Sequence, residues 1–217
     1  MTLNAWLKIS LVVLLAGSVG ALGAEVDVWR KLRDPLKGPL CFDVPCPHYT
    51  ARMAAIESVI AQHSGGPLYL AIGDSLTEFA ELGSICGREP INAGIGWATS
   101  ETFQKHGARL AAALKPDFIV VALGTNDATR GKADFRENMT ALLASLKDYP
   151  VVLIPIPGGP GVTKAAEYNA TLKQFSPLAQ PITAFESTDD GVHLAPSAYP
   201  KWKQSIRIAA ERFVCPN

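Results

Sequence analysis

Four short motifs carry side chains that could cooperate in nucleophilic catalysis. In chain order they are Gly73–Leu76, Asn92–Gly94, Gly124–Asp127 and Asp190–His193. A serine hydroxyl is a poor nucleophile until a base takes its proton, and a histidine that a carboxylate orients is such a base. Backbone and side-chain N–H groups stabilise the oxyanion that then forms. Together the motifs supply the parts that a serine-dependent acyl transfer requires.

The nucleophile of this set is Ser75, and its base is His193. Alone, Ser75 would be interpreted as a helix cap or a turn residue, because Gly-Asp-Ser is common in both. The other three motifs reverse that interpretation. Asp190 is the expected orienting carboxylate because it lies three residues before the histidine on one loop, whereas the adjacent Asp189 is a less well spaced substitute.

The other histidines and two further aspartates have simpler interpretations. No acidic residue is spaced to pair with the three remaining histidines, so we expect them in exposed or capping positions: His48, His63 and His106. Asp74 and Asp127 lie inside the motifs at turn-forming positions, and we interpret them as braces of those turns rather than as catalysts.

The elements expected around the motifs alternate between strands and helices. Strands are expected at 68–72, near Ile91, and at 118–123, 151–154 and 182–185. Helices are expected at 50–63, directly after Ser75, and at 101–114, 133–147, 163–176 and 197–213. This alternation predicts a three-layer α/β/α sandwich around a central, mainly parallel five-stranded sheet. Because each motif follows a predicted strand, the four should converge on one edge of that sheet.

The four spaced blocks resemble those of the GDSL-type, or SGNH, hydrolase family, over nearly all of the chain after its first 67 residues. The resemblance implies a flavodoxin-like fold and serine esterase chemistry without a metal or an organic cofactor. It implies that Ser75 is the nucleophile and that Asp190 and His193 complete a triad. The oxyanion donors that it implies are the amides of Ser75 and Gly94 and the side chain of Asn126.

One position departs from the family pattern. The second block of the family often continues Gly-x-Ser-Gly-Asp, whereas this chain places Trp97 where a glycine would stand beside the oxyanion hole. A tryptophan there could form a hydrophobic or sugar-stacking wall for the substrate, or it could be an ordinary core residue. Trp97 is therefore a candidate substrate-binding residue.

The beginning of the chain is typical of an exported protein. An apolar run at 9–17 follows Lys8 and precedes a cluster of small residues at 18–24, which is the pattern of a secretory signal peptide. A retained membrane anchor is the alternative, but the run is short for a membrane span. We therefore expect export to the periplasm or beyond, with no stable membrane insertion after cleavage. The predicted plan is a signal peptide, an extension with one helix and a hydrolase domain, at 1–24, 25–66 and 67–217.

The four cysteines all lie after the signal segment, and an even number of cysteines suits an oxidising compartment. Their spacing does not fit a zinc site. Four cysteines allow three pairings. In a flavodoxin-like sandwich the helix after the first strand and the last helix lie side by side, which favours a Cys86–Cys215 bond. Cys41 and Cys46 then remain to pair with each other.

Composition narrows the function classes further. The 217-residue chain has a formal net charge of zero and no run of basic residues, so a nucleic-acid partner has no support.

We expect a monomer whose partner is a small-molecule or glycan ester. The acyl group is expected to be short, such as acetyl, because no cap domain is expected to enclose a long chain. The same site could serve a broad thioesterase, a lysophospholipase or an O-acyltransferase. A catalytically silent carbohydrate-binding protein is the alternative from another class.

Overall fold

The computed structural model describes residues 47–176 and 186–215, and within them a four-stranded parallel sheet forms the centre. The strands are β1 (Leu68–Gly73), β2 (Glu89–Gly94), β3 (Phe118–Ala122) and β4 (Val151–Leu153). Their order in the sheet is β2-β1-β3-β4, so the chain reverses its direction across the sheet after β2. The predicted α/β class with a parallel sheet is confirmed. The fifth predicted strand, 182–185, lies outside the described residues.

Seven α-helices connect and flank the strands in the part of the chain that the structure describes. They are α2 (Pro47–Gln62), α3 (Ser75–Glu78), α4 (Ser100–Leu114), α5 (Thr125–Arg130), α6 (Phe135–Ser145), α7 (Ala165–Leu172) and α8 (Tyr199–Phe213). The six-residue α5, which follows β3, was not expected from the sequence. Within residues 47–176 and 186–215, none of these helices is long and apolar enough to cross a membrane.

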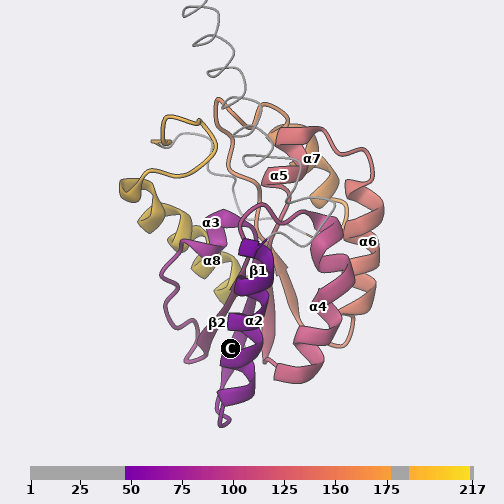
Figure 1. The fold of residues 1–217 in the computed structure, drawn as a ribbon, viewed down its shortest axis with the longest axis vertical. Coiled ribbons are helices and arrows are strands. Elements are labelled where there is room, and N and C mark those ends of the chain that lie inside the picture. Colours follow the sequence, from indigo (N-terminus) through magenta and orange to yellow (C-terminus); the bar gives the residue numbers. More distant parts are fainter. Residues whose placement is uncertain (1–46, 177–185, 216–217) are drawn as a thin grey trace, which may run out of the picture. The chain divides into compact units, whose positions relative to one another are not determined.

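Alternating side chains of the strands build two cores, one on each face of the sheet. Leu70 and Ile72 of β1 pack among buried residues of α2, α4, α6 and α7 on one face. Tyr69 and Ala71 pack on the other face, where Trp202 belongs to the apolar side of α8. Figure 1 shows α4 and α6 side by side, with α8 in yellow on the opposite side of the sheet. Burial on both faces is the usual reason for continuously apolar strands.

Helix α2 contributes to the first of these cores. Its Met53 and Ile56 side chains are buried among residues of β1 and α4, and the described residues from Pro47 onward belong to one compact unit. This helix is the one expected within the 25–66 extension, and it packs in the layer that covers the sheet. The predicted 1–24 signal peptide lies outside the described residues.

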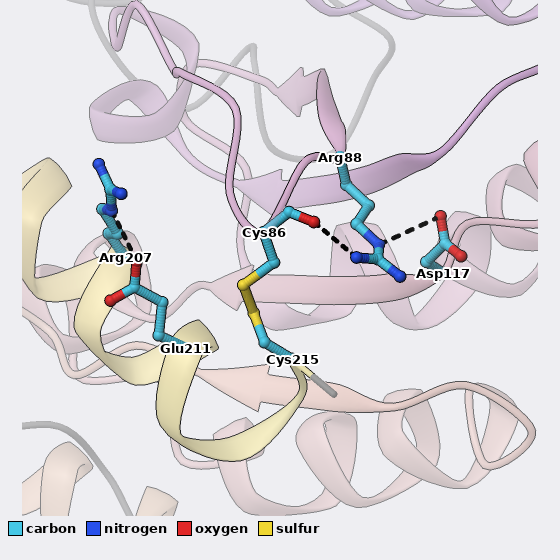
Figure 2. Close-up of a disulfide and its surroundings, with 6 residues drawn as sticks. All are labelled: Cys86, Arg88, Asp117, Arg207, Glu211 and Cys215. Atoms are coloured by element: carbon cyan, nitrogen blue, oxygen red, sulfur yellow. Dashed lines mark hydrogen bonds and ion pairs between the residues drawn. A yellow bond between two sulfur atoms is a disulfide. The ribbon is translucent and has the colours of Figure 1, made fainter. Parts of the chain in front are cut away.

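A disulfide between Cys86 and Cys215 lies at the edge of the sheet where the strands begin (Figure 2). Cys86 precedes β2, and Cys215 follows α8. Beside the disulfide, Arg88 donates to the Cys86 carbonyl and pairs with Asp117, whose carboxylate also accepts the Leu68 N–H at 3.0 Å. This is the pairing predicted for these two cysteines. The predicted Cys41–Cys46 pair lies outside the described residues.

Removal of this disulfide is expected to destabilise the fold. A Cys86→Ala/Cys215→Ala variant should lose about 3–5 kcal/mol of unfolding free energy, because the bond closes a loop with a sequence separation of 129. Urea unfolding under non-reducing conditions measures the loss. A Cys41→Ala/Cys46→Ala variant is the matched control, and its loss should be smaller because that pair would close a much shorter loop. An unchanged urea midpoint in the Cys86/Cys215 variant would contradict the prediction.

Candidate active site

Ser75 is held at the turn between the first strand and a short helix. β1 ends at Gly73, Asp74 is the N-cap of α3, and Ser75 is the first residue of that helix. The Asp74 carboxylate accepts the Leu76 N–H at 3.0 Å, and burial raises the pKa of this carboxyl group to about 6. The N–H of a residue in the first turn of a helix has no partner within the helix. The turn therefore presents both the Ser75 hydroxyl and its amide at the end of the sheet.

His193 connects Ser75 to Asp190. Its Nε2 atom lies 2.9 Å from Ser75 Oγ, and its Nδ1 atom lies 2.6 Å from Asp190 Oδ2. Ser75 is buried, with 7% of its surface exposed, and it lines the same cleft as the histidine. With Nδ1–H donating to the carboxylate, Nε2 is left as the acceptor for the serine proton. The three side chains therefore have the connectivity of a nucleophile, a base and an orienting carboxylate.

The second oxygen of Asp190 shapes its own loop. Asp190 Oδ1 accepts the N–H groups of Val192 and His193 at 2.8 and 3.0 Å and the Thr188 hydroxyl at 2.8 Å. Desolvation raises the pKa of Asp190, but the hydrogen bonds from the His193 ring and from these donors outweigh it and hold the pKa well below its usual range. The carboxylate is therefore ionised throughout the neutral range. Gly161 N–H donates to the Gly191 carbonyl at 2.9 Å, so the Pro/Gly-rich segment after β4 braces this loop.

Asn126 reaches the same edge from β3. It is the second residue of α5, it is buried, and it donates from Nδ2 to the Ala98 carbonyl at 2.9 Å. A primary amide has two N–H bonds, so one can hold the loop while the other is offered to a ligand. The neighbouring Asp127 accepts both the N–H and the hydroxyl of Ser100, the hydroxyl at 2.6 Å. Asp127 is thus the brace that the sequence predicted.

Gly94, the third predicted oxyanion donor, is not placed for that role in this structure. Its N–H donates to Asn92 Oδ1 at 2.9 Å, and Gly94 is not among the residues that line the cleft at Ser75. A Cβ atom at this position would lie 2.2 Å from the Glu78 nitrogen. The glycine is therefore required because the end of β2 passes directly against α3. Gly96, two residues later, lines the cleft instead.

The cleft beside Ser75 has a volume of about 350 Å³ and mainly apolar walls. It is lined by His48, Ser75, Phe79, Gly96, Trp97, Asn126, Thr129, Asp190, Val192 and His193. Trp97 is 45% exposed, which excludes the alternative that it is a core residue. Its φ of 67° lies in the left-handed region that favours glycine. The tryptophan that replaces the family's glycine therefore forms part of the cleft wall.

Two residues that line the cleft, His48 and Phe79, were not predicted as site residues from the sequence. His48 Nε2 lies 3.0 Å from Glu78 Oε2, so His48 does have an acidic partner, 30 residues away in the chain. That distance hides the pair from any local spacing rule. Phe79 could have been found, because it follows Ser75 by four residues and positions four apart lie on the same face of a helix. Within 47–176 and 186–215, no group of three or more His, Cys, Asp or Glu side chains is arranged to hold a metal ion.

The sequence matches the model of the GDSL-like lipase/acylhydrolase family over residues 71–194, which is more than half of the chain. This match spans all four motifs, from the end of β1 to the loop that carries His193. None of the curated proteins matches the chain.

Solved structures of similar architecture support the fold. A protein from Streptococcus pneumonia, assigned provisionally as a platelet activating factor, has a TM-score of 0.64 at 17% identity, over 85% of this chain and 98% of its own. A GDSL-like lipase from Bacteroides thetaiotaomicron has a TM-score of 0.60 at 18% identity, over 73% and 97%. An acetylxylan esterase from Geobacillus stearothermophilus has a TM-score of 0.56 at 17% identity, over 70% and 98%.

Proposed function

Because the chain belongs to the GDSL-like lipase/acylhydrolase family, we propose that it is a serine ester hydrolase that works through an acyl-Ser75 intermediate. One observation carries the proposal. At the end of β1, His193 contacts Ser75 and Asp190 at the same time. Its Nε2 atom lies 2.9 Å from Ser75 Oγ, and its Nδ1 atom lies 2.6 Å from Asp190 Oδ2. A binding protein would have no need for a nucleophile, a base and a carboxylate in this connectivity. The structure therefore favours an enzyme over a catalytically silent carbohydrate-binding protein.

In the acylation step, His193 takes the Ser75 proton as Oγ attacks the carbonyl carbon of the ester. The oxygen of the tetrahedral intermediate accepts hydrogen bonds from the Ser75 amide and the Asn126 carboxamide. Asp190 holds the imidazole in the reactive tautomer and stabilises its positive charge. The C–O bond to the alcohol then breaks, and His193 gives its proton to the leaving oxygen. The product of this step is the acyl-Ser75 ester and a free alcohol.

In the deacylation step, a water molecule takes the place of the alcohol. His193 removes one proton from the water as its oxygen attacks the acyl carbon. The same N–H donors hold the second tetrahedral intermediate. Its collapse returns the proton from His193 to Ser75 Oγ and releases the carboxylic acid. No step of this sequence requires a group beyond these side chains and water.

The preferred substrate is proposed to be a short-chain ester, with an acetyl ester of a glycan as the leading candidate. A volume of about 350 Å³ is at the low end for small-molecule sites, so it suits a small acyl group with part of its alcohol. The exposed Phe79 ring beside the serine suits the apolar face of a sugar. The structural similarity to an acetylxylan esterase agrees with this class of substrate.

The place of action is proposed to be outside the cytoplasm. The signal-like segment at 1–24 motivates this proposal, and the disulfide between Cys86 and Cys215 supports it, because structural disulfides persist in oxidising compartments. N-terminal sequencing of protein recovered from the periplasm or the medium tests it. Mature protein that begins near residue 22 to 25 is the expected result, and retention of Met1 in the cytoplasmic fraction would contradict it.

A fluorophosphonate probe tests the proposed function directly. We expect one label per molecule, mapped to the peptide that contains Ser75, and protection by a short-chain ester. An accompanying panel of acetyl to octanoyl esters should show the highest kcat/KM at the short end. Adding a sugar acceptor and thioester substrates distinguishes a hydrolase from an acyltransferase and a thioesterase. A folded protein without a label at Ser75 would end the serine hydrolase interpretation.

A further inference from the structure

We propose that the two exposed aromatic rings of the cleft divide the bound ester between them. Phe79 forms the wall on the alcohol side, and Trp97 forms the wall that limits the acyl group. Within the described residues, four large apolar side chains are prominently exposed: Val59, Phe79, Trp97 and Ile208. Two of the four line the Ser75 cleft, and both are more than two-fifths exposed. This inference rests on the proposed function and adds a basis for its specificity.

Phe79 lies on the side of His193. Its N–H donates to the Ser75 carbonyl at 3.0 Å, which places it one helical turn beyond the nucleophile. Its ring centroid is 5.7 Å from that of the His193 ring, with a tilt of 41°. The leaving oxygen must come within hydrogen-bond reach of His193 Nε2 to receive its proton. The alcohol attached to that oxygen therefore leaves the reaction centre alongside the Phe79 ring.

Trp97 lies next to the oxyanion donor. The residue that follows it, Ala98, accepts a hydrogen bond from Asn126, so the Trp97 backbone is fixed beside that carboxamide. A carbonyl carbon has three substituents. Once its oxygen points to Asn126 and its alcohol oxygen to His193, the acyl substituent takes the remaining part of the cleft. The lining residues not yet assigned are His48, Gly96, Trp97, Thr129 and Val192, and Trp97 has the largest side chain among them. The indole then sets the length of acyl chain that fits.

The segment that carries Trp97 is held from both sides. The Gly96 N–H donates to the Glu78 carboxylate, which also contacts His48 Nε2 at 3.0 Å. Arg52 Nε donates to the Gly94 carbonyl at 2.9 Å and lies 3.7 Å from the same Glu78 carboxylate. Glu78 follows Ser75 by three residues, so this network ties the segment to the nucleophile's own helix. A wall held in this way keeps its position when a longer acyl chain approaches.

The backbone and the ring of Trp97 both indicate a fixed wall. A φ of 67° is costly for a residue with a Cβ atom, and glycine would adopt it without strain. The Arg130 guanidinium lies 5.9 Å from the centre of the indole, within the range of a cation–π contact. The surrounding contacts thus maintain a tryptophan where the backbone conformation favours a glycine. That combination is expected where the side chain itself has a function.

The test uses Trp97→Gly, Phe79→Ala and a control at an exposed apolar residue outside the cleft, Ile208→Ala. Trp97→Gly suits the local backbone, so the variant should fold, and its urea midpoint checks that it does. Each protein is assayed on two series, acetyl to octanoyl esters of one alcohol and acetyl esters of ethanol, phenol and a sugar. The two series separate an effect on the acyl group from an effect on the alcohol.

We expect Trp97→Gly to raise the octanoyl-to-acetyl ratio of kcat/KM on the order of tenfold, with little change along the alcohol series. Phe79→Ala should raise KM for the ring alcohols on the order of tenfold relative to ethyl acetate, with an unchanged acyl ratio. Ile208→Ala should change neither. An active Trp97→Gly enzyme with the wild-type acyl ratio, or with an altered alcohol preference instead, would overturn the inference. Wild-type protein that hydrolyses no ester and takes no label at Ser75 would overturn the proposed function itself.

Discussion

Replacing Ser75 by alanine is expected to lower kcat for ester hydrolysis by on the order of 10⁴-fold or more. The hydroxyl lies 2.9 Å from His193 Nε2 and, in the proposed mechanism, forms the covalent bond to the acyl group. Without it, only the oxyanion donors and the cleft remain to assist a direct attack by water. Replacing His193 by alanine should cost a similar factor, because the neutral hydroxyl then has no base. Initial rates on an acetyl ester near pH 8 measure both effects.

The combination of these two changes gives a sharper result. If Ser75 and His193 act as one unit, the double variant should be no slower than either single variant, because each single change already disables the covalent route. If the two side chains contributed independently, the rate losses of the two single variants would multiply in the double variant. Ser84→Ala is the matched control, since Ser84 is an exposed serine outside the cleft and its loss should leave the rate unchanged. A folded Ser75→Ala protein with wild-type activity would rule out the proposed mechanism.

The folded state should tolerate these changes. Ser75 is the first residue of α3, but the N-cap of that helix is Asp74, whose carboxylate accepts the Leu76 N–H. The cap therefore survives in Ser75→Ala. Circular dichroism and the urea midpoint should match the wild type closely. A loss of activity can then be assigned to chemistry rather than to unfolding.

The motif positions were predictable because they depend on topology. Side chains that follow parallel strands meet at one edge of a sheet, whatever the details of the loops. Ser75 after β1, Asn126 after β3 and the Asp190–His193 loop all reach that edge in the structure. The Cys86–Cys215 bond followed from the same topology at the opposite edge. Of the predicted sheet, the strand at 182–185 lies outside the described residues.

The role of Gly94 was not predictable in the same way. A glycine can be required by a close approach or by a donor function, and the sequence does not distinguish the two. Here the side chain of Asn92 accepts the Gly94 N–H, while the Asn92 amide donates to the Thr77 carbonyl at 2.7 Å. These contacts depend on the distance between β2 and α3, which only the three-dimensional structure gives. The His48–Glu78 pair was missed for the same reason, since its members lie on different helices.

Replacing Asp190 by asparagine is the second change for which we expect a large loss, on the order of 10²–10⁴ in kcat. The carboxamide oxygen can still accept the N–H groups of Val192 and His193, so the loop should keep its shape. The amide nitrogen, however, would then face His193 Nδ1 and favour the tautomer that carries its proton on Nε2. That tautomer cannot accept the Ser75 proton, and the imidazolium would lose its neighbouring negative charge.

Asp189→Asn is the control for this prediction, because it makes the same chemical change one residue away. It should keep nearly the full rate, since no contact of Asp189 with His193 is found among the described residues. Equal losses in the two variants would mean that loop charge matters and not the specific contact. A severe loss in Asp189→Asn with a mild one in Asp190→Asn would exchange their roles.

The pH dependence of the free energy of unfolding distinguishes an effect of the ionised Asp190 carboxylate from a general structural effect of its substitution. The hydrogen bonds to Asp190 hold its pKa in the folded protein below the usual value near 3.9, so the unfolded chain binds its proton first as the pH falls. Its stabilising contribution is therefore fully present above about pH 5 and is lost progressively as the pH falls below about 4. The difference in unfolding free energy between wild type and Asp190→Asn should therefore shrink as the pH falls below about 4. Above about pH 5 the Asp190 carboxylate is ionised, so an acid limb of kcat/KM between pH 5 and 8 cannot belong to Asp190. A difference in unfolding free energy between the two proteins that persisted unchanged down to about pH 3 would contradict this prediction.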